Sequence, residues 1–358
     1  MAIGLSHGGT TIYSSPSPSK ELLVGTAEGF VIIQREAPGG SWRVAHRALT
    51  ERHLSAIIFE PQSGLIFAGA FHGSVHVSAD GGMTWEQRDN GLSQDNVYSL
   101  ASVRRNGRVR LYAGTEPAHL FYSDDLGLHW TELPALRSVP GVPQWSFPAP
   151  PHIAHLKHIN FDPEKPTTIY ASIEVGGLLK STDAGESWQE LSGVYEDVHR
   201  VVIHPHNPKR MYVTGGDGLY VTSDGGVTWE HWTARTAEIG GYPDMLVYCP
   251  RQPELMLIAA AHESPGTWRK TRFAGARISR SKNGGKIWEV LRNGLPDRMQ
   301  ASIEAMCLED WGESFSVFAA TTAGEIYSSD DGGEHWTKII SGLAPISKAG
   351  HYRNLVAA

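Results

Sequence analysis

Short apolar runs separated by turn residues fill most of the chain. Apolar residues alternate with polar ones or cluster in runs of roughly four to eight, bounded by Gly, Pro, Asn and Asp, as β-strands require. Residues 65–70 and 169–173 are examples. We find no stretch with the periodicity of an amphipathic helix longer than about three turns. The pattern predicts an all-β fold.

A short box of small and polar residues that ends at a tryptophan recurs along the chain. Residues 78–85 read Ser-Ala-Asp-Gly-Gly-Met-Thr-Trp, and a worn copy at 37–42 has Ala37 in the aspartate position. Asp accepts hydrogen bonds from nearby backbone amides, Gly permits a positive φ, and Trp brings a large apolar surface to the next strand. We therefore interpret the box as a structural hairpin. The six good copies begin at Ser78, Ser123, Ser181, Thr222, Ser281 and Ser329.

The spacing of the boxes indicates a repeat architecture. The tryptophans at 42, 85, 130, 188, 229, 288 and 336 are 43, 45, 58, 41, 59 and 48 residues apart. A period of this size is typical of propellers, and each period has room for four short strands. We predict a single seven-bladed β-propeller with four-stranded blades. The predicted blades are residues 10–50 with 350–358, 51–92, 93–136, 150–193, 194–235, 240–295 and 299–345.

The innermost strand of the first blade has two candidates, residues 10–14 and residues 351–357. We favour the second, because pairing the C-terminal segment into the first blade closes the ring and removes free strand edges. The predicted closure therefore joins the N- and C-terminal segments of the chain. Shortening the chain to residue 347 is expected to destabilise the fold.

The box resembles the Asp-box, or BNR repeat, of sialidases, sortilin-type receptors, xyloglucan-degrading glycosidases and the photosystem II stability factor. The resemblance covers nearly the whole chain and implies a β-propeller, whereas those relatives have unrelated functions. Sialidases carry a Phe-Arg-Ile-Pro motif that is absent here, and only Arg353 and Tyr98 could take sialidase roles. The xyloglucan enzymes use two propellers, and the stability factor has a basic assembly surface. We therefore do not expect a typical sialidase.

Charge and composition narrow the partners and the compartment. The 358 residues carry a formal net charge of −7, which argues against nucleic acid or an anionic membrane as a partner. We find no apolar run long enough for a membrane span and no secretory signal at the start. Cys249 and Cys307 cannot form a disulfide framework. We expect a cytoplasmic protein.

Polar residues gather where the predicted inner strands begin. Residues two apart share one side of a strand, so two rings should meet at one mouth of the central channel, and ionisable groups in a concave pocket are typical of a functional site. The first ring comprises His53, Asn96, His155, Asp197, Tyr242, Ser302 and His351. The second comprises Ser55, Tyr98, Lys157, His199, Asp244, Glu304 and Arg353. Neighbouring loops could add His72, Glu116, His119, Glu174, Asp217 and His262.

Acid–base catalysis is the leading hypothesis for these rings. His199 would act as general base or acid, Asp244 or Glu304 would orient it, and Tyr98 would be a further proton donor. Cationic side chains would hold an anionic substrate or stabilise an oxyanion. We therefore predict a hydrolase or lyase that acts on a small polar or anionic molecule, for example a carbohydrate, without a required cofactor. The candidate substrate-binding residues are Lys157, Arg353, His53, His155, His351 and Trp268.

Two alternatives stay open. In the first, His53, His155, His199 and His351 ligate iron, copper, manganese or zinc, with Glu304 or Asp244 completing the shell. We rank this below acid–base chemistry because no local spacing of residues supports a metal.

In the second alternative the protein is a non-catalytic propeller that binds a protein partner. Two insertions, residues 133–152 and 262–277, interrupt the repeats and carry Trp145 and Trp268, which we expect to be exposed. Long loops on a rigid scaffold often carry function. Both insertions should lie at the rim where the inner strands begin.

Overall fold

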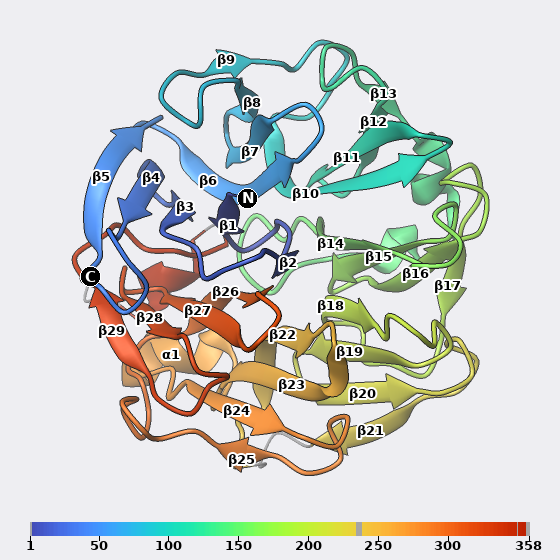
Figure 1. Cartoon of the computed structure of the whole chain (residues 1–358). Coiled ribbons are helices and arrows are strands. Elements are labelled where there is room, and N and C mark those ends of the chain that lie inside the picture. The colour runs from blue at the N-terminus through green and yellow to red at the C-terminus, as the bar shows by residue number, and fades with distance from the viewer. Residues whose placement is uncertain (1, 234–237, 349, 356–358) are drawn as a thin grey trace.

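Seven sheets surround a central axis in the computed structural model, which describes residues 2–233, 238–348 and 350–355 (Figure 1). Six sheets have four strands each, and the last has five. Within each sheet the strands follow one another outward from the axis in chain order, as in a propeller blade. The prediction of a seven-bladed propeller is therefore confirmed.

In the part of the chain that the structure describes, the blades are built from 29 short strands. Blade 1 holds β1 (Ile3–Leu5), β3 (Glu21–Thr26), β4 (Gly29–Gln34) and β5 (Arg43–Ala48); blade 2 holds β6 (His53–Glu60), β7 (Leu65–Phe71), β8 (Ser74–Ser78) and β9 (Glu86–Gln87). Blade 3 holds β10 (Asn96–Arg105), β11 (Arg108–Glu116), β12 (Leu120–Ser123) and β13 (Thr131–Glu132); blade 4 holds β14 (His155–Phe161), β15 (Ile169–Glu174), β16 (Gly177–Ser181) and β17 (Gln189–Leu191). Blade 5 holds β18 (Val198–Ile203), β19 (Met211–Gly215), β20 (Gly218–Thr222) and β21 (Glu230–Thr233); blade 6 holds β22 (Tyr242–Cys249), β23 (Gln252–Ala261), β24 (Arg277–Ser281) and β25 (Glu289–Val290). Blade 7 holds β2 (Ile12–Ser14), β26 (Ile303–Asp310), β27 (Phe315–Thr321), β28 (Ile326–Ser329) and β29 (Thr337–Ile340).

The polar boxes form the turns between the last two strands of the blades. In blade 4, Ser181 Oγ donates to Asp183 Oδ1 over 2.7 Å and accepts from the Gly185 amide over 2.8 Å. Gly185 has a φ of +98°, and its carbonyl accepts from Trp188 Nε1. The Ser187 hydroxyl, together with Ser181, lowers the pKa of Asp183 to about 2. The box therefore satisfies its own aspartate, as expected of a structural hairpin.

Apolar side chains fill the spaces between neighbouring blades. Between blades 6 and 7, for example, Met245, Leu257, Met306 and Val317 are fully buried, and the box residue Trp336 packs against the same cluster. Burial of this apolar surface is the main force that holds adjacent sheets together. The core is therefore distributed around the ring, and the axis is left for other side chains.

The N-terminal segment closes the ring. Strand β1 pairs in parallel with β3 in blade 1, and β2 pairs in parallel with β26 in blade 7. The prediction that residues 351–357 supply the inner strand of blade 1 is therefore wrong; residues 351–354 form the short 3-10 helix η3 (His351–Asn354), and residues 356 and 357 lie outside the described residues. The other candidate, residues 10–14, does include a strand, but it belongs to blade 7. Because the N-terminal segment pairs with both blade 1 and blade 7, no C-terminal strand is needed to close the ring.

The turn between β1 and β2 lies inside the channel, where Figure 1 places the N-terminus near the centre of the ring. The Gly8 amide donates to the Ser55 carbonyl over 2.8 Å, and the Leu100 amide donates to the Gly8 carbonyl over 3.1 Å. A Cβ atom on Gly8 would lie 2.1 Å from the Tyr98 carbonyl oxygen. Only glycine allows the segment to pack this closely against the inner strands.

Both insertions lie at the rim where the inner strands begin. The helix α1 (Pro265–Thr271) in the second insertion places the Trp268 ring 6.2 Å from that of Tyr242, the first residue of β22. The first insertion, which contains η1 (Pro134–Ser138) and η2 (Val142–Gln144), places Phe147 5.1 Å from His155, the first residue of β14. The predicted position of the insertions is confirmed.

The tryptophans of the insertions are less exposed than expected. Trp268 is fully buried and anchors α1, with Nε1 donating to the Glu263 carbonyl over 2.8 Å. Trp145 is half-buried. The expected exposure of these two rings is therefore wrong, because each packs its insertion onto the propeller.

In the described ranges, no helix has the length and apolarity needed to cross a membrane.

Replacing Ser181 with alanine tests the box. The variant leaves the buried Gly185 amide without its acceptor, so Ser181→Ala should lower the free energy of unfolding by about 1–3 kcal/mol. Urea unfolding measures the change, and Ser192→Ala, at an exposed serine of the same blade, is the control. Equal stability of both variants and the wild type would contradict the role assigned to the box.

Candidate functional site

Six inner strands each carry one extra residue at the same level. In blade 4, Leu156 pairs with Ile173 and His158 pairs with Ser172, so Lys157 has no partner across the ladder. Such a β-bulge redirects the side chain of the extra residue, and here it faces the axis. The extra residues are Ser55, Tyr98, Lys157, His199, Asp244 and Glu304. These are the members of the second predicted ring from blades 2–7.

Two lysines and two carboxylates form an ionic core at the axis. Lys157 Nζ lies 3.1 Å from Glu174 Oε1 and 2.9 Å from Asp244 Oδ1. Lys348 Nζ lies 2.9 Å and 3.0 Å from the same two oxygens. All four side chains are at most 1% exposed. Each charge therefore has two neighbours of opposite sign, and we call these four residues the ionic core.

Opposite charges keep the core ionised despite its burial. Burial alone would raise the pKa of Glu174 and Asp244, but the Lys157 and Lys348 ammonium groups hold both well below their usual range. Burial lowers the pKa of Lys157 despite both carboxylates. For Lys348, Asp244 and Glu174 outweigh burial and raise the pKa. Charge pairing, with little help from solvent, holds these groups in place.

His155 and Tyr98 extend the core toward blade 3. His155 Nε2 lies 2.5 Å from Glu174 Oε2, and its Nδ1 lies 3.4 Å from Glu116 Oε2. Burial lowers the pKa of His155, but Glu174 and Glu116 together raise it, which favours the imidazolium. The Tyr98 ring stacks on it at 3.8 Å, and burial, reinforced by Glu116, raises the pKa of Tyr98 well above its usual value. Tyr98 is therefore a neutral phenol at ordinary pH.

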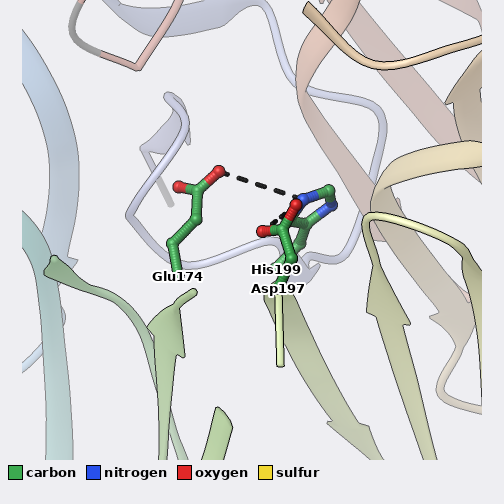
Figure 2. Close-up of side chains that lie close together, drawn as sticks. All are labelled: Glu174, Asp197 and His199. Carbon is green, nitrogen blue, oxygen red and sulfur yellow. Dashed lines mark ion pairs between the residues drawn. The ribbon is translucent and has the colours of Figure 1, made fainter. Parts of the chain in front are cut away.

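One ring nitrogen of His199 faces two acidic side chains, Asp197 and Glu174 (Figure 2). Its Nδ1 donates to the Pro243 carbonyl over 2.7 Å. Its Nε2 lies 3.3 Å from Asp197 Oδ1 and 3.9 Å from Glu174 Oε1. An imidazole oriented by a carbonyl and flanked by carboxylates has the arrangement of a general acid or base.

The same three residues, Glu174, Asp197 and His199, have ligand atoms within 4.8 Å of one another, the spacing of a metal site. Two lysines, Lys157 and Lys348, already contact Glu174 Oε1. Their positive charge makes a metal cation at this site unfavourable. Among the described residues, the four histidines proposed as ligands do not form a group with this spacing. His53 Nε2 instead contacts the Ser347 carbonyl over 2.8 Å.

The C-terminal segment, residues 343–348 and 350–355, covers this mouth of the channel. Glu304 Oε2 accepts from Ser347 Oγ over 2.8 Å and from the Lys348 amide over 3.0 Å. His351 Nδ1 lies 3.4 Å from Glu304 Oε1. The Phe147 ring of the first insertion stacks on His351 at 5.8 Å. The charged groups are therefore enclosed by other parts of the same chain.

Not every predicted ring residue joins the cluster. Arg353 is exposed on η3. The positive charge that the sequence predicts from Arg353 comes instead from Lys348. His53 is half-buried beside the cluster, and Trp268 lies within α1, where its ring packs against Tyr242. The sequence predicts Glu174 only in a rim loop, although its position as a charged residue at the end of an apolar strand indicates a functional side chain. The C-terminal segment has no periodicity, so Lys348 gave no signal.

Matches to two family models place the boxes in a known repeat class. The family described as Photosynthesis system II assembly factor YCF48 matches residues 36–157, and the family described as sortilin, neurotensin receptor 3, matches residues 176–301. The fold is that of a seven-bladed β-propeller with box turns. The chain belongs to the Asp-box (BNR) propeller superfamily.

Individual relatives are distant. The photosystem II assembly lipoprotein Ycf48 of Synechococcus sp. (strain CC9902) is 23% identical over 84% of this chain and 79% of its own length. Xyloglucanase Xgh74A of Acetivibrio thermocellus is 21% identical over 51% of this chain and 26% of its own length. Among solved structures, an ancestral GH74 enzyme has a TM-score of 0.63 at 16% identity and covers 81% of this chain, which spans 39% of that enzyme. YCF48 bound to D1 peptide has a TM-score of 0.54 at 15% identity, covering 92% and 88% of the two chains.

Replacing Lys348 tests the ionic core. Lys348→Met leaves two buried carboxylates with one ammonium, so the free energy of unfolding should fall by about 3–5 kcal/mol. Lys338→Met removes a half-exposed lysine that pairs with Glu325 and should cost at most about 1 kcal/mol. Urea unfolding of both variants measures the difference. A Lys348→Met variant no less stable than Lys338→Met would show that the core contributes nothing.

Acid should weaken the core in a predictable direction. The folded pKa values of Glu174 and Asp244 lie well below their usual range, so their contribution is complete above the unfolded pKa values of about 4 and is lost as pH falls below them. Lys348→Met reduces this depression of the pKa. Between pH 6 and pH 3 the urea midpoint should therefore fall more steeply in the wild type than in the variant. Equal slopes would contradict the assignment.

Proposed function

We propose that this protein is a non-catalytic binding propeller and that its partner is a protein with an acidic segment. The observation that carries the proposal is the closure of the charged mouth by the chain itself, with Lys348 fully buried between Glu174 and Asp244. A hydrolase needs substrate and water at its acid and base. The similarity to an assembly factor over 84% of this chain, and a propeller of the same fold solved with a bound peptide, support a binding role.

An arginine-rich hairpin offers a docking surface. The ladder between β10 and β11 pairs Arg105 with Arg108 and Val103 with Arg110, so three arginines share one face of the hairpin. Like charges opposite each other on a sheet are unfavourable. Arg110 Nη2 is paired with Asp124 at 2.6 Å. In the described part of the chain, no carboxylate lies within 4.0 Å of Arg105 or Arg108.

The surface around these arginines fits an acidic ligand. Arg105, Asn106, Arg108, Arg110 and Asp124 line a depression of about 420 Å³. Carboxylates of a partner would supply the counter-charges that Arg105 and Arg108 lack. Because the chain as a whole carries a net charge of −7, a local basic patch would also orient an acidic partner as it approaches.

The hairpin lies at the end of β10 that is farther from the ionic core. Along β10, Tyr98 lies at the level of the ionic core, Ser102 lines a cavity in the channel, and Arg105 comes three residues later. At about 3.3 Å per residue, Arg105 is about 10 Å beyond the cavity. The proposed docking face is therefore opposite the mouth that the C-terminal segment covers.

A hydrolase is the second candidate. The arrangement of His199 with Asp197 and Glu174 favours it, and GH74 enzymes share the fold. Catalysis would require the C-terminal segment to leave the charged mouth so that a carbohydrate could reach His199. We rank it second because that segment is bonded to the ionic core itself.

Charge reversal of the hairpin tests the binding proposal. Fluorescence anisotropy would measure binding of a labelled glutamate-rich decapeptide, with a lysine-rich decapeptide for comparison. Arg105→Glu with Arg108→Glu should weaken binding of the acidic peptide by at least about tenfold, equivalent to about 1.4 kcal/mol. Added salt should weaken wild-type binding, because the contact is electrostatic.

The control makes the same charge change elsewhere. Arg43→Glu with Arg47→Glu alters two exposed arginines on β5 and should leave binding unchanged. Absence of saturable binding, or an equal loss in both double variants, would exclude the hairpin as the docking surface. Release of oligosaccharides from xyloglucan that is lost in His199→Ala would favour the hydrolase instead.

A further inference from the structure

A cavity of about 220 Å³ lies in the channel between the N-terminal segment and the inner strands of blades 3–6. Gly9, Thr10, Thr11 and Ile12 form one wall. The opposite walls come from β10, β14, β18 and β22, beyond the level of the ionic core. The volume is that of about seven water molecules at roughly 30 Å³ each. It therefore suits a ligand of only a few heavy atoms.

The lining of this cavity is polar and contains no carboxylate. Hydroxyl, amide, imidazole and guanidinium groups all contribute. A site with donors and a cation but without acidic side chains selects against cations and favours oxygen-rich anions. The polar residues of the lining are Thr10, Thr11, Ser102, His158, Asn160, Arg200 and Tyr248.

Arg200 is the cation of the cavity, and its hydrogen-bonding capacity is only partly used. It is 2% exposed and directly follows the bulged residue His199 on β18. Its Nη2 donates to the His7 carbonyl over 2.7 Å and to Met245 Sδ over 3.6 Å, whereas its Nε has no hydrogen-bond partner among the described residues. In the ranges that the structure describes, no carboxylate lies within 4.0 Å of its guanidinium. Leaving a buried cation with an unpaired donor is costly.

The protonation states of the neighbours match an anion. Burial lowers the pKa of Arg200 only to about 10, so it stays charged at neutral pH. Burial, reinforced by Arg200, holds the pKa of His158 well below its usual value, so this ring is neutral. His158 Nδ1 accepts from the Val201 amide over 3.4 Å, which places the proton on Nε2. The cavity therefore has one fixed positive charge and one neutral ring donor.

Anchoring the N-terminal segment does not account for Arg200. One N–H donor on the His7 carbonyl would serve that purpose, and a neutral amide could provide it without burying a charge. We infer that the cavity binds a small oxyanion, a carboxylate or a phosphate, with Arg200 as its principal ligand and His158 and the lining hydroxyls as further donors.

Titration calorimetry with sodium succinate and with sodium phosphate, at constant ionic strength in sodium chloride, tests the site. The wild type should bind at least one of these anions, and the identity of that anion distinguishes a carboxylate from a phosphate ligand. Arg200→Gln should weaken binding by about ten- to hundredfold, the usual value of a hydrogen bond to a charged group. Arg280→Gln, at a buried arginine paired with Glu289 and Glu334, is the control and should leave anion binding unchanged.

A second variant protects the test if Arg200→Gln fails to fold. Ser102→Phe fills the cavity from a half-buried wall position and should abolish binding without touching Arg200. Absence of binding of both anions by the wild type, or unchanged binding in Ser102→Phe, would overturn the inference. Arg105→Glu with Arg108→Glu should retain anion binding, so failure of the docking proposal and failure of this site can be told apart.

Discussion

Two buried lysines alternate with two buried carboxylates at the axis of the propeller, and much of the structure depends on their pairing. Withdrawing these charges from water costs several kcal/mol per ion, and only close, complementary geometry offsets the cost. Glu174 and Lys157 come from blade 4, Asp244 from blade 6 and Lys348 from the C-terminal segment. The contacts that Lys348 makes therefore fasten the C-terminal segment over one mouth of the channel.

A β-bulge at the same level of several inner strands allows repeated blades to form this charged cluster. Each bulge turns one side chain toward the axis without interrupting the rest of the ladder, so the same local irregularity delivers Lys157, His199, Asp244 and Glu304 to one level. Below that level the N-terminal segment fills one side of the channel, and the cavity with Arg200 occupies the other. Charge therefore differs along the axis. At one level it is paired and enclosed by the C-terminal segment, and beyond that level the buried Arg200 has no carboxylate within 4.0 Å among the described residues.

The sequence predicted what the repeat encodes and missed what tertiary contacts decide. The boxes, the blade count and the level of the ring residues follow from local turn chemistry and spacing, so they could be read from the chain. The strand Ile3–Leu5 could not, because three residues in parallel pairing carry no turn signal. Lys348 lies on an irregular segment, and its role depends on carboxylates more than 100 residues away. The sequence does not predict that the C-terminal segment covers the charged mouth. This covering argues against a catalytic role for His199.

Hydrogen–deuterium exchange at the Lys348 amide tests most directly whether the charged mouth is closed. This amide donates to Glu304 Oε2 over 3.0 Å inside the cluster, and nearby the Ile346 amide donates to the Thr321 carbonyl over 3.2 Å. If the ionic core fastens the segment, both amides should exchange as slowly as those of the inner strands, because exchange then requires the core to open. Exchange at the rate of an unprotected loop would contradict the account and leave the cluster accessible to a substrate.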